Sequence, residues 1–217
     1  MVSIERRRSN EREFSFFTRL WTLDSDHCMA SAMTNIWGLI DNRTGHTGQV
    51  LGVITRLGIP YTLKRLEYNR LAALPSFLIG RSLIGLDKER SAPLNGPYPD
   101  LLIAAGRRTL PVLRHIKKLS PATRSIYLMR PESMEGIDLA VVPEHDGVAA
   151  AENIITSLAP LHAVTPDTLA AARKAWEPQF AHLPRPFITL CMGGNTKRGQ
   201  YAPAEWRDVV NRAILLA

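Results

Sequence analysis

The chain of 217 residues is long enough for one large domain, or for one domain and part of a second. Its composition, 45% hydrophobic and 22% charged, excludes a fibrous or intrinsically disordered chain. The net charge of +7 favours anionic partners, and no apolar run is long enough to cross a bilayer. We therefore expect a cytoplasmic protein, with peripheral association with an anionic inner membrane as a further option.

Two classes of partner are disfavoured by the motifs. The basic residues are dispersed, and neither the aromatic and basic motif of an RNA-binding sheet nor a zinc-finger spacing is present. We therefore expect no nucleic-acid partner. Cys28 and Cys191 are far apart and form no CxxC pair, so the sequence predicts no metal site and no cofactor.

The first part of the chain differs from the rest. In residues 1–34, acidic and basic residues interrupt the apolar core that a signal peptide would need, so we expect a poorly ordered extension. After it, short apolar runs alternate with amphipathic stretches. The pattern predicts a strand at residues 35–40, a polar loop from 41, a helix at 49–57 and a strand at 61–66. This is a βαβ unit, which implies parallel strands.

The same alternation continues along the chain. The pattern next predicts a helix or helical hairpin at 71–86, a strand at 100–105, a helix at 109–119, and strands at 125–129 and 138–142. Residues 152–158 fit either a helix or a strand. A helix at 166–180 has Thr165 as its N-cap and Pro166 at its first position.

A second domain is expected to begin after a proline-rich linker. A strand at 187–192, a glycine-rich turn at 193–199 and a helix at 203–216 would form its first β-α unit, and the chain then ends. We therefore predict an α/β protein with a Rossmann-like, doubly wound parallel sheet at residues 35–182. Residues 183–217 would be a linker and the truncated start of a second Rossmann-like domain.

Four segments that could bind a ligand fall at the carboxyl ends of predicted strands, where open parallel sheets bind ligands. The first, "DNRTGHTGQ" at 41–49, leads into a helix N-terminus, which favours anions. Gly45 and Gly48 allow close backbone approach, Arg43 supplies donors, and His46 could act as a base or a donor. A plain polar turn between strand and helix is the alternative.

The other three segments follow the same logic. Gly106, Arg107 and Arg108 could clamp a phosphate; the alternative is that both arginines are simply solvated at the surface. Glu144, His145 and Asp146 could form a base with an orienting acid, but neighbouring residues of a strand point to opposite sides. No GxSxG elbow accompanies them, and they supply too few ligands for a metal. The last segment combines a glycine turn with a cation that suits phosphate, at Gly193, Gly194 and Lys197.

Several stretches together resemble a known family. They are "IWGLIDNRTGHTGQVLGV", "PDLLIAAGRRTLPV", "DLAVVPEHD", "LHAVTPDTLAAAR" and "CMGGNTK". Their order is that of the mitochondrial fission ELM (elongated mitochondria) family, and the resemblance runs from about residue 36 to residue 197. This family resembles GT-B glycosyltransferases, in which two Rossmann-like domains face a cleft. Its plant branch is associated with recruiting a dynamin-related protein to the mitochondrial surface.

The resemblance implies a site and two competing functions. Gly45 and His46 match a glycine-rich acceptor-side loop similar to the GGH turn of peptidoglycan glycosyltransferases, and Gly193, Gly194 and Lys197 would lie at the interdomain cleft. The first function is sugar transfer from a nucleotide-sugar donor to an envelope or lipid-linked acceptor, for which this chain alone would be inactive. The second is a non-catalytic module that recruits a protein partner. A Rossmann-type epimerase or reductase ranks last, because neither its glycine fingerprint nor its Tyr-x-x-x-Lys pair is present.

Overall fold

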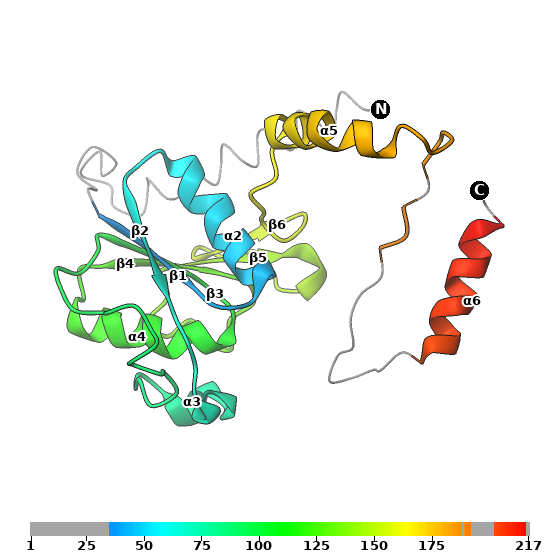
Figure 1. Cartoon of the computed structure of the whole chain (residues 1–217). Coiled ribbons are helices and arrows are strands. Elements are labelled where there is room, and N and C mark those ends of the chain that lie inside the picture. The colour runs from blue at the N-terminus through cyan, green and yellow to red at the C-terminus, as the bar shows by residue number, and fades with distance from the viewer. Residues whose placement is uncertain (1–34, 188, 192–201, 216–217) are drawn as a thin grey trace. The chain divides into compact units, whose positions relative to one another are not determined.

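The structure is a computed structural model that describes residues 35–187, 189–191 and 202–215. Contacts divide the chain into two units, residues 1–164 and 165–217. The first unit holds one parallel sheet (Figure 1). Its strands lie in the order β2-β1-β3-β4-β5-β6, and every neighbouring pair is parallel. They are β1 (Ile36–Ile40), β2 (Tyr61–Arg65), β3 (Leu101–Ala105), β4 (Arg124–Leu128), β5 (Leu139–Pro143) and β6 (Ile154–Ser157).

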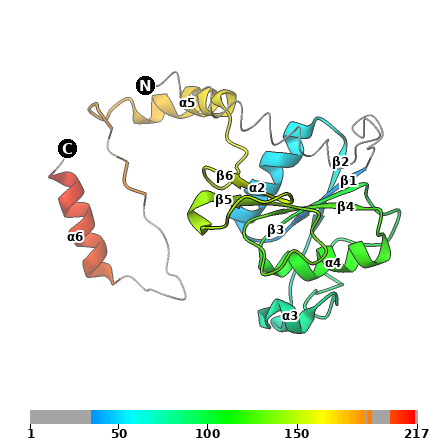
Figure 2. The ribbon, with the colours of Figure 1, turned by 180° about the vertical axis from the view of Figure 1, so that it is seen from behind.

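The sheet has a separate apolar core on each face. The side chains of β3 alternate between them, because successive residues of a strand point to opposite faces: Ile103 belongs to one core and Leu102 to the other. Helix α2 (Thr44–Ile54) covers the first face, and helix α4 (Leu110–Leu119) covers the second (Figures 1 and 2). The predicted α/β class with a doubly wound, Rossmann-like parallel sheet is confirmed. The ambiguous stretch at 152–158 is a strand.

The predicted start of the first helix is wrong. α2 begins at Thr44, five residues before the predicted start, and a 3-10 turn, η2 (Thr55–Leu57), follows it. Gly45, His46 and Gly48 therefore lie in a helix and not in a long loop. The apolar periodicity begins only at Val50, so it gave no signal for a polar first turn that tertiary contacts hold in place.

The predicted helix or helical hairpin at 71–86 is also wrong. Only two short turns form there, η3 (Arg70–Ala73) and α3 (Ser76–Ile79). Pro75 and Gly80 interrupt the helical pattern. The side chain of Asn69 replaces helical hydrogen bonds: its oxygen accepts from the Leu71 backbone at 2.9 Å, and its amide donates to the Ile84 carbonyl at 2.8 Å.

In the second unit, helix α5 (Pro166–Phe180) matches its prediction, and the Thr165 side chain caps it by accepting from the Thr168 backbone. Helix α6 (Pro203–Ile214) also matches. Residues 187 and 189–191 are not in a strand, so the predicted strand at 187–192 is not seen in its described residues. Gly193, Gly194, Lys197 and residues 1–34 lie outside the described residues. The contacts place α5 with the second unit; the boundary at 182/183 stays a prediction.

The strand order fixes where a ligand would bind. From β1 the chain moves outward to β2, then crosses back over β1 to β3 and continues in the opposite direction. The direction of winding therefore reverses between β1 and β3. In open parallel sheets, the crevice outside the carboxyl ends of two such strands is the usual ligand site.

Candidate active site

A buried carboxylate marks the switch point between β1 and β3. Asp41 follows directly after β1, and its side chain is 1% exposed. One of its oxygens accepts a hydrogen bond from the Arg43 backbone at 3.0 Å, and its own carbonyl accepts from the Thr47 hydroxyl at 3.0 Å. These two bonds hold the strand end against the first turn of α2, where His46 lies.

His46 faces this carboxylate. Its Nδ1 atom lies 3.4 Å from each oxygen of Asp41, and the ring is 15% exposed. The distance is long for a hydrogen bond. Because a carboxylate only accepts, a neutral His46 here carries its proton on Nδ1 and has an accepting lone pair on Nε2. The pair therefore has the arrangement of a general base with an orienting acid.

Arg108 adds a positive charge to the pair. It comes from the turn η4 (Arg107–Thr109) after β3, and its Nη2 atom donates to Asp41 Oδ2 at 3.1 Å and to Asn42 Oδ1 at 3.0 Å. Its guanidinium lies 4.5 Å from the centre of the Tyr68 ring, which is a cation–π contact. Arg108 thus links the ends of β1 and β3 through Asp41.

The surroundings of Asp41 keep it ionised. Burial alone would raise the pKa of its carboxyl. The hydrogen bonds from His46 and the Arg43 backbone, together with the charges of His46 and Arg108, outweigh burial, so the pKa lies below its usual value. Asp41 therefore accepts hydrogen bonds at neutral pH and does not donate them.

Gly106 provides the room for the His46 ring. Its φ is +91°, a conformation that side chains rarely adopt. A Cβ built here would overlap with Nδ1 and Cε1 of His46. The Thr109 hydroxyl donates to the Gly106 carbonyl at 2.8 Å and fixes the turn. The predicted site residue Gly106 thus lies in the site, where it makes space for a side chain.

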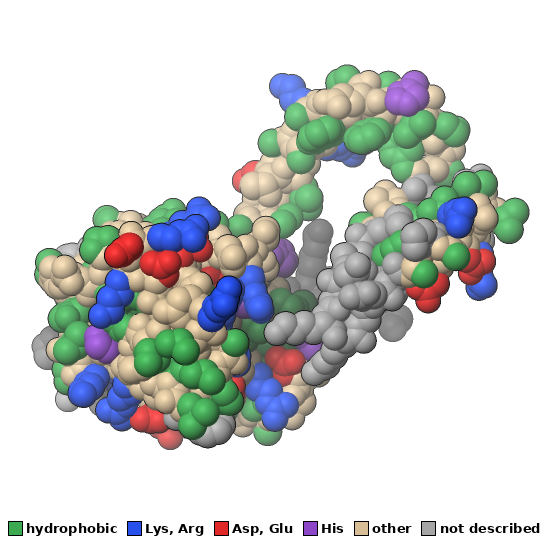
Figure 3. Space-filling view, turned by 60° about the horizontal axis from the view of Figure 1, so that its bottom comes forward, with side chains coloured by type: hydrophobic (Ala, Val, Ile, Leu, Met, Phe, Trp, Pro, Cys, Tyr) green, Lys and Arg blue, Asp and Glu red, His purple; other side chains and the backbone are tan. Residues whose placement is uncertain are grey.

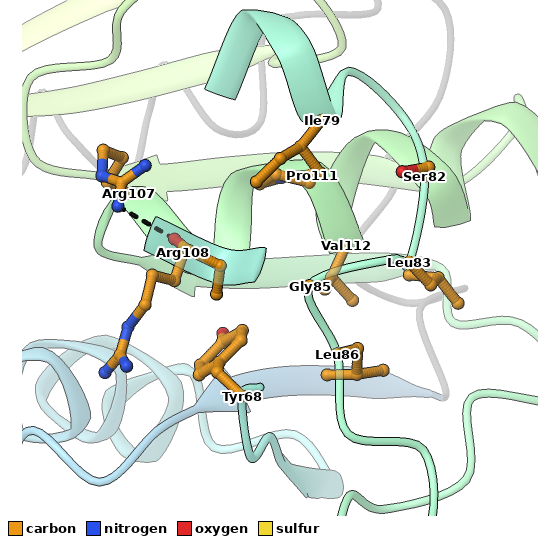
Figure 4. A pocket seen from close by; sticks show the side chains of 11 residues that line it. Tyr68, Ile79, Ser82, Leu83, Gly85, Leu86, Arg107, Arg108, Pro111 and Val112 are labelled. Carbon is orange, nitrogen blue, oxygen red and sulfur yellow. Dashed lines mark hydrogen bonds between the residues drawn. The ribbon is translucent and has the colours of Figure 1, made fainter. Parts of the chain in front are cut away.

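Arg107 is directed away from the Asp41 pair. Its two terminal nitrogens donate to the backbone carbonyls of Leu74 at 2.7 Å and Ala72 at 3.0 Å. Figure 4 shows the Arg107 and Arg108 guanidinium groups pointing to different places, with Arg108 beside Tyr68. This geometry favours a role for Arg107 in holding the chain between β2 and β3.

A small cavity lies behind Arg108, but it cannot hold a substrate. Its volume is about 10 Å³, enough for about one water molecule. Among the described residues, two buried polar atoms near it have no hydrogen-bond partner, the Tyr68 hydroxyl and Arg108 Nε. Burial raises the pKa of Tyr68, so its hydroxyl is a donor at neutral pH. One water could satisfy both atoms, and a substrate would have to approach His46 from outside.

The predicted group at 144–146 forms a separate feature. Glu144, His145 and Asp146 form a turn, η5, at the carboxyl end of β5, and His145 Nε2 lies 3.8 Å from the Asp146 carboxylate. The His145 side chain is 62% exposed. β5 is three strand positions from β1, on the order of 14 Å away. The structure therefore brings these residues to the same edge as His46 but not together with it.

The remaining predicted site residues that the structure describes, Arg43, Gly45 and Gly48, lie at the N-cap and in the first turns of α2. The Arg43 side chain is exposed. Its backbone N–H donates the hydrogen bond to Asp41 described above. A Cβ at Gly45 or Gly48 would meet no described atom within 4 Å, so packing does not require glycine at either position. Glycine in a helix costs about 1 kcal/mol relative to alanine. Both glycines leave the backbone of this turn accessible to a ligand.

Asp41 and Tyr68 were not among the site residues predicted from sequence. Asp41 belongs to the loop at 41–49, and an acid placed directly after a buried strand was an available signal. Its spacing of five residues from His46 matched no known pairing pattern. Tyr68 lies beyond β2 in the chain and approaches Arg108 only through the fold, so no local signal marked it.

Neither a metal site nor a membrane span is found in the part of the chain that the structure describes. No group of three or more His, Cys, Asp or Glu side chains among these residues is placed to hold a metal ion. No helix among them is long and apolar enough to cross a bilayer.

The comparison with protein families shows which family the chain belongs to. The model of the family described as mitochondrial fission ELM1 matches residues 44–216. The chain belongs to the mitochondrial fission ELM1 family. The matched region of this family includes His46, Gly106 and Arg108, and begins just after Asp41.

One curated relative adds to this picture. An uncharacterized protein of Rickettsia prowazekii (strain Madrid E) is 36% identical over 114 residues, which are 52% of this chain and 32% of that relative. The match thus spans about a third of the relative's length. No solved structure matches the chain significantly.

Proposed function

We propose that this ELM1-family protein takes part in glycosyl transfer, with His46 as the general base. The observation that carries the proposal is the Asp41–His46 pair at the switch point of the sheet. The acceptor would be a hydroxyl group, and the donor a nucleotide sugar, as in the GT-B enzymes that the family resembles.

The chemistry follows from the orientation of His46. Nε2 removes the proton from the acceptor hydroxyl as its oxygen attacks the anomeric carbon of the sugar. The bond between that carbon and the phosphate oxygen breaks, and the nucleoside diphosphate leaves with the electron pair. Asp41 holds Nδ1 and stabilises the imidazolium that forms, since its carboxylate is ionised and buried.

The first turn of α2 offers donors for anionic groups. Its backbone N–H groups and helix dipole favour negative charge, and Gly45 and Gly48 leave that backbone uncovered. Arg43, at the N-cap, adds an exposed cation. In the proposal, Lys197 and the glycines at 193 and 194 serve the donor side; they belong to the second predicted domain.

The test uses the intact full-length protein and measures release of nucleotide from a panel of UDP-, GDP- and dTDP-sugars. Replacing a general base lowers the rate on the order of 10²- to 10⁴-fold. His46→Gln should show such a loss, and Asp41→Asn a smaller one. The matched control is His145→Gln, which removes an exposed imidazole at the same edge and should keep the rate. Turnover by His46→Gln equal to that of the unchanged protein would refute the assignment.

A second candidate, recruitment of a protein partner, is favoured by α5. None of the residues of α5, all described, is buried, and Leu169 and Trp176 are 60% and 54% exposed. Trp176 stacks on Phe180 with ring centres 6.3 Å apart. Exposed aromatic side chains on one helix are typical of binding surfaces. Binding of a purified dynamin-related protein that survives His46→Gln but is lost in Trp176→Ser would favour this function; the reverse pattern would exclude it.

A further inference from the structure

The chain between β2 and β3 forms a tied loop, residues 69–86, which we call the 69–86 loop. Its ends meet, because the Asn69 backbone donates to the Gly85 carbonyl at 3.1 Å and Tyr68 forms a β-bridge with Leu86. Arg107 donates to two carbonyls in its first third, those of Leu74 and Ala72. The loop therefore has a defined conformation, held by hydrogen bonds within it and by Arg107.

This loop holds large apolar side chains in solvent. Ala72 and Ile79 are 5% and 7% exposed and anchor it on the molecule. Among the loop's described side chains, four large apolar ones are between 40% and 63% exposed: Leu71, Leu74, Leu78 and Ile84. Because hydrogen bonds fix the loop, these side chains cannot simply fold back into the core. Exposed apolar side chains gathered in one segment and bordered by polar residues mark an interaction surface.

Basic side chains surround the same apolar groups. An open groove of about 570 Å³ lies between the loop and α4. It is lined by Ile79, Arg81, Ser82, Leu83, Ile84, Lys88, His115 and Lys118. Figure 3 turns this side of the first unit toward the viewer and shows apolar surface bordered by Lys and Arg side chains. The surface thus combines apolar and cationic character.

The acidic Glu135 lies beside the groove, next to Arg81. Glu135 accepts from Nη2 of Arg81 at 2.8 Å and from its Nε at 3.0 Å, and these bonds lower the pKa of Glu135. Glu135 is therefore ionised at neutral pH and balances the charge of Arg81. The charged residues that line the groove are all basic, and Lys88 and Lys118 among them are exposed; Asp87 and Glu89 flank Lys88 in the chain.

We propose that the 69–86 loop and the adjacent face of α4 bind peripherally to a membrane that contains anionic lipids. Leu78 and Ile84 enter the boundary between headgroups and acyl chains, and Lys88 and Lys118 contact lipid phosphates. A planar surface that is anionic outside and apolar inside satisfies both kinds of side chain at once. An acidic peptide would satisfy the lysines but would leave the exposed leucines in water. The proposal does not depend on catalysis by His46.

The experiment measures co-sedimentation of the full chain with phosphatidylcholine vesicles that contain or lack phosphatidylglycerol. Each Lys or Arg near an anionic surface contributes about a fivefold increase in binding, so Lys88→Gln with Lys118→Gln should weaken it roughly 25-fold. Leu78→Ser with Ile84→Ser should weaken it about tenfold or more. The controls, Leu158→Ser and Lys174→Gln, change exposed side chains outside this surface and should bind like the unchanged chain. His46→Gln should also bind normally.

Any of the following outcomes would overturn the proposal. One is binding that none of the four substitutions weakens, or no binding to anionic vesicles at all. Another is equal binding to vesicles without phosphatidylglycerol. The third is a dimer in light-scattering measurements without lipid that Leu78→Ser and Ile84→Ser dissociate, because the surface would then contact a second copy. Circular dichroism of each variant confirms that the fold is kept, as expected for exposed positions.

Discussion

The ring of His46 lies against the backbone of Gly106, in space that any other residue at position 106 would occupy with its Cβ. His46 belongs to the helix after β1, and Gly106 directly follows β3, so the contact joins the ends of the two strands between which the direction of winding reverses. Position 106 requires glycine for two reasons: its φ is +91°, and the His46 ring leaves no room for a Cβ.

Gly106→Ala should therefore destabilise the protein and displace His46 from Asp41. The backbone strain alone costs on the order of 1–3 kcal/mol, and the overlap with the ring adds to it. Urea unfolding and nucleotide release measure the two effects. Gly58→Ala is the matched control, since Gly58 has a φ of +67° but a Cβ at this position would meet no described atom within 4 Å. It should show the strain without the loss of turnover; equal behaviour of the two variants would contradict the role of the ring.

Gly45→Ala and Gly48→Ala should have the opposite effect on stability. Both positions are helical and open, so alanine should raise the free energy of unfolding by about 0.5–1 kcal/mol each. If a ligand lies against this turn, the same variants should bind it more weakly. Thermal unfolding and nucleotide-sugar titration together test this. A gain in stability with undiminished ligand binding would show that the ligand does not contact the turn.

Asp41→Asn should change how stability depends on pH. The pKa of Asp41 in the folded protein is lowered, so its contribution is present above its ordinary value of about 4 and is lost as the pH falls through the folded value. At neutral pH, the variant should be less stable by about 1–3 kcal/mol, since His46 and Arg108 lose a buried partner. The difference should shrink below pH 4 in urea unfolding experiments. A difference that stays constant down to pH 2 would contradict the lowered pKa.

Arg107→Ala should loosen the 69–86 loop. The loss of two hydrogen bonds to the carbonyls of Ala72 and Leu74 should cost about 1–3 kcal/mol, because the donor is charged. Hydrogen exchange of the loop amides should accelerate, whereas exchange in β1 and β3 should change less. Arg43→Ala removes an exposed arginine of the same edge and should leave exchange in the loop unchanged. Unaltered protection of the loop in Arg107→Ala would mean that Arg107 does not hold it.

Much of the sheet could be predicted because each buried parallel strand is a short apolar run between polar segments. Residues 100–105 and 138–142 show this, and both are strands within one residue at each end. The prediction for 71–86 failed because the apolar spacing of this stretch also suits a helix. Its backbone groups are instead bonded by Asn69 and Arg107, which no local pattern reveals.

The candidate site was predicted in part. His46, Gly106 and Arg108 were singled out because they follow strands, and the structure places them around one carboxylate. Arg107 and Arg108 could not be distinguished in sequence, since adjacent residues of a turn point in different directions. For positions 144–146 the sequence predicted a separate base with its own orienting acid, and this stays a prediction; Asp41, which was not singled out, lies within reach of His46.

The sequence by itself determined the α/β class, most strands and the edge of the sheet where polar residues gather, because these depend on local periodicity and on the direction of parallel strands. Only the tertiary structure decided which of those residues meet. The order β2-β1-β3 brings Asp41, His46 and Arg108 together and leaves His145 three strands away. The physical reason is that strand order is set by the packing of both faces, which is a property of the whole chain and not of any segment.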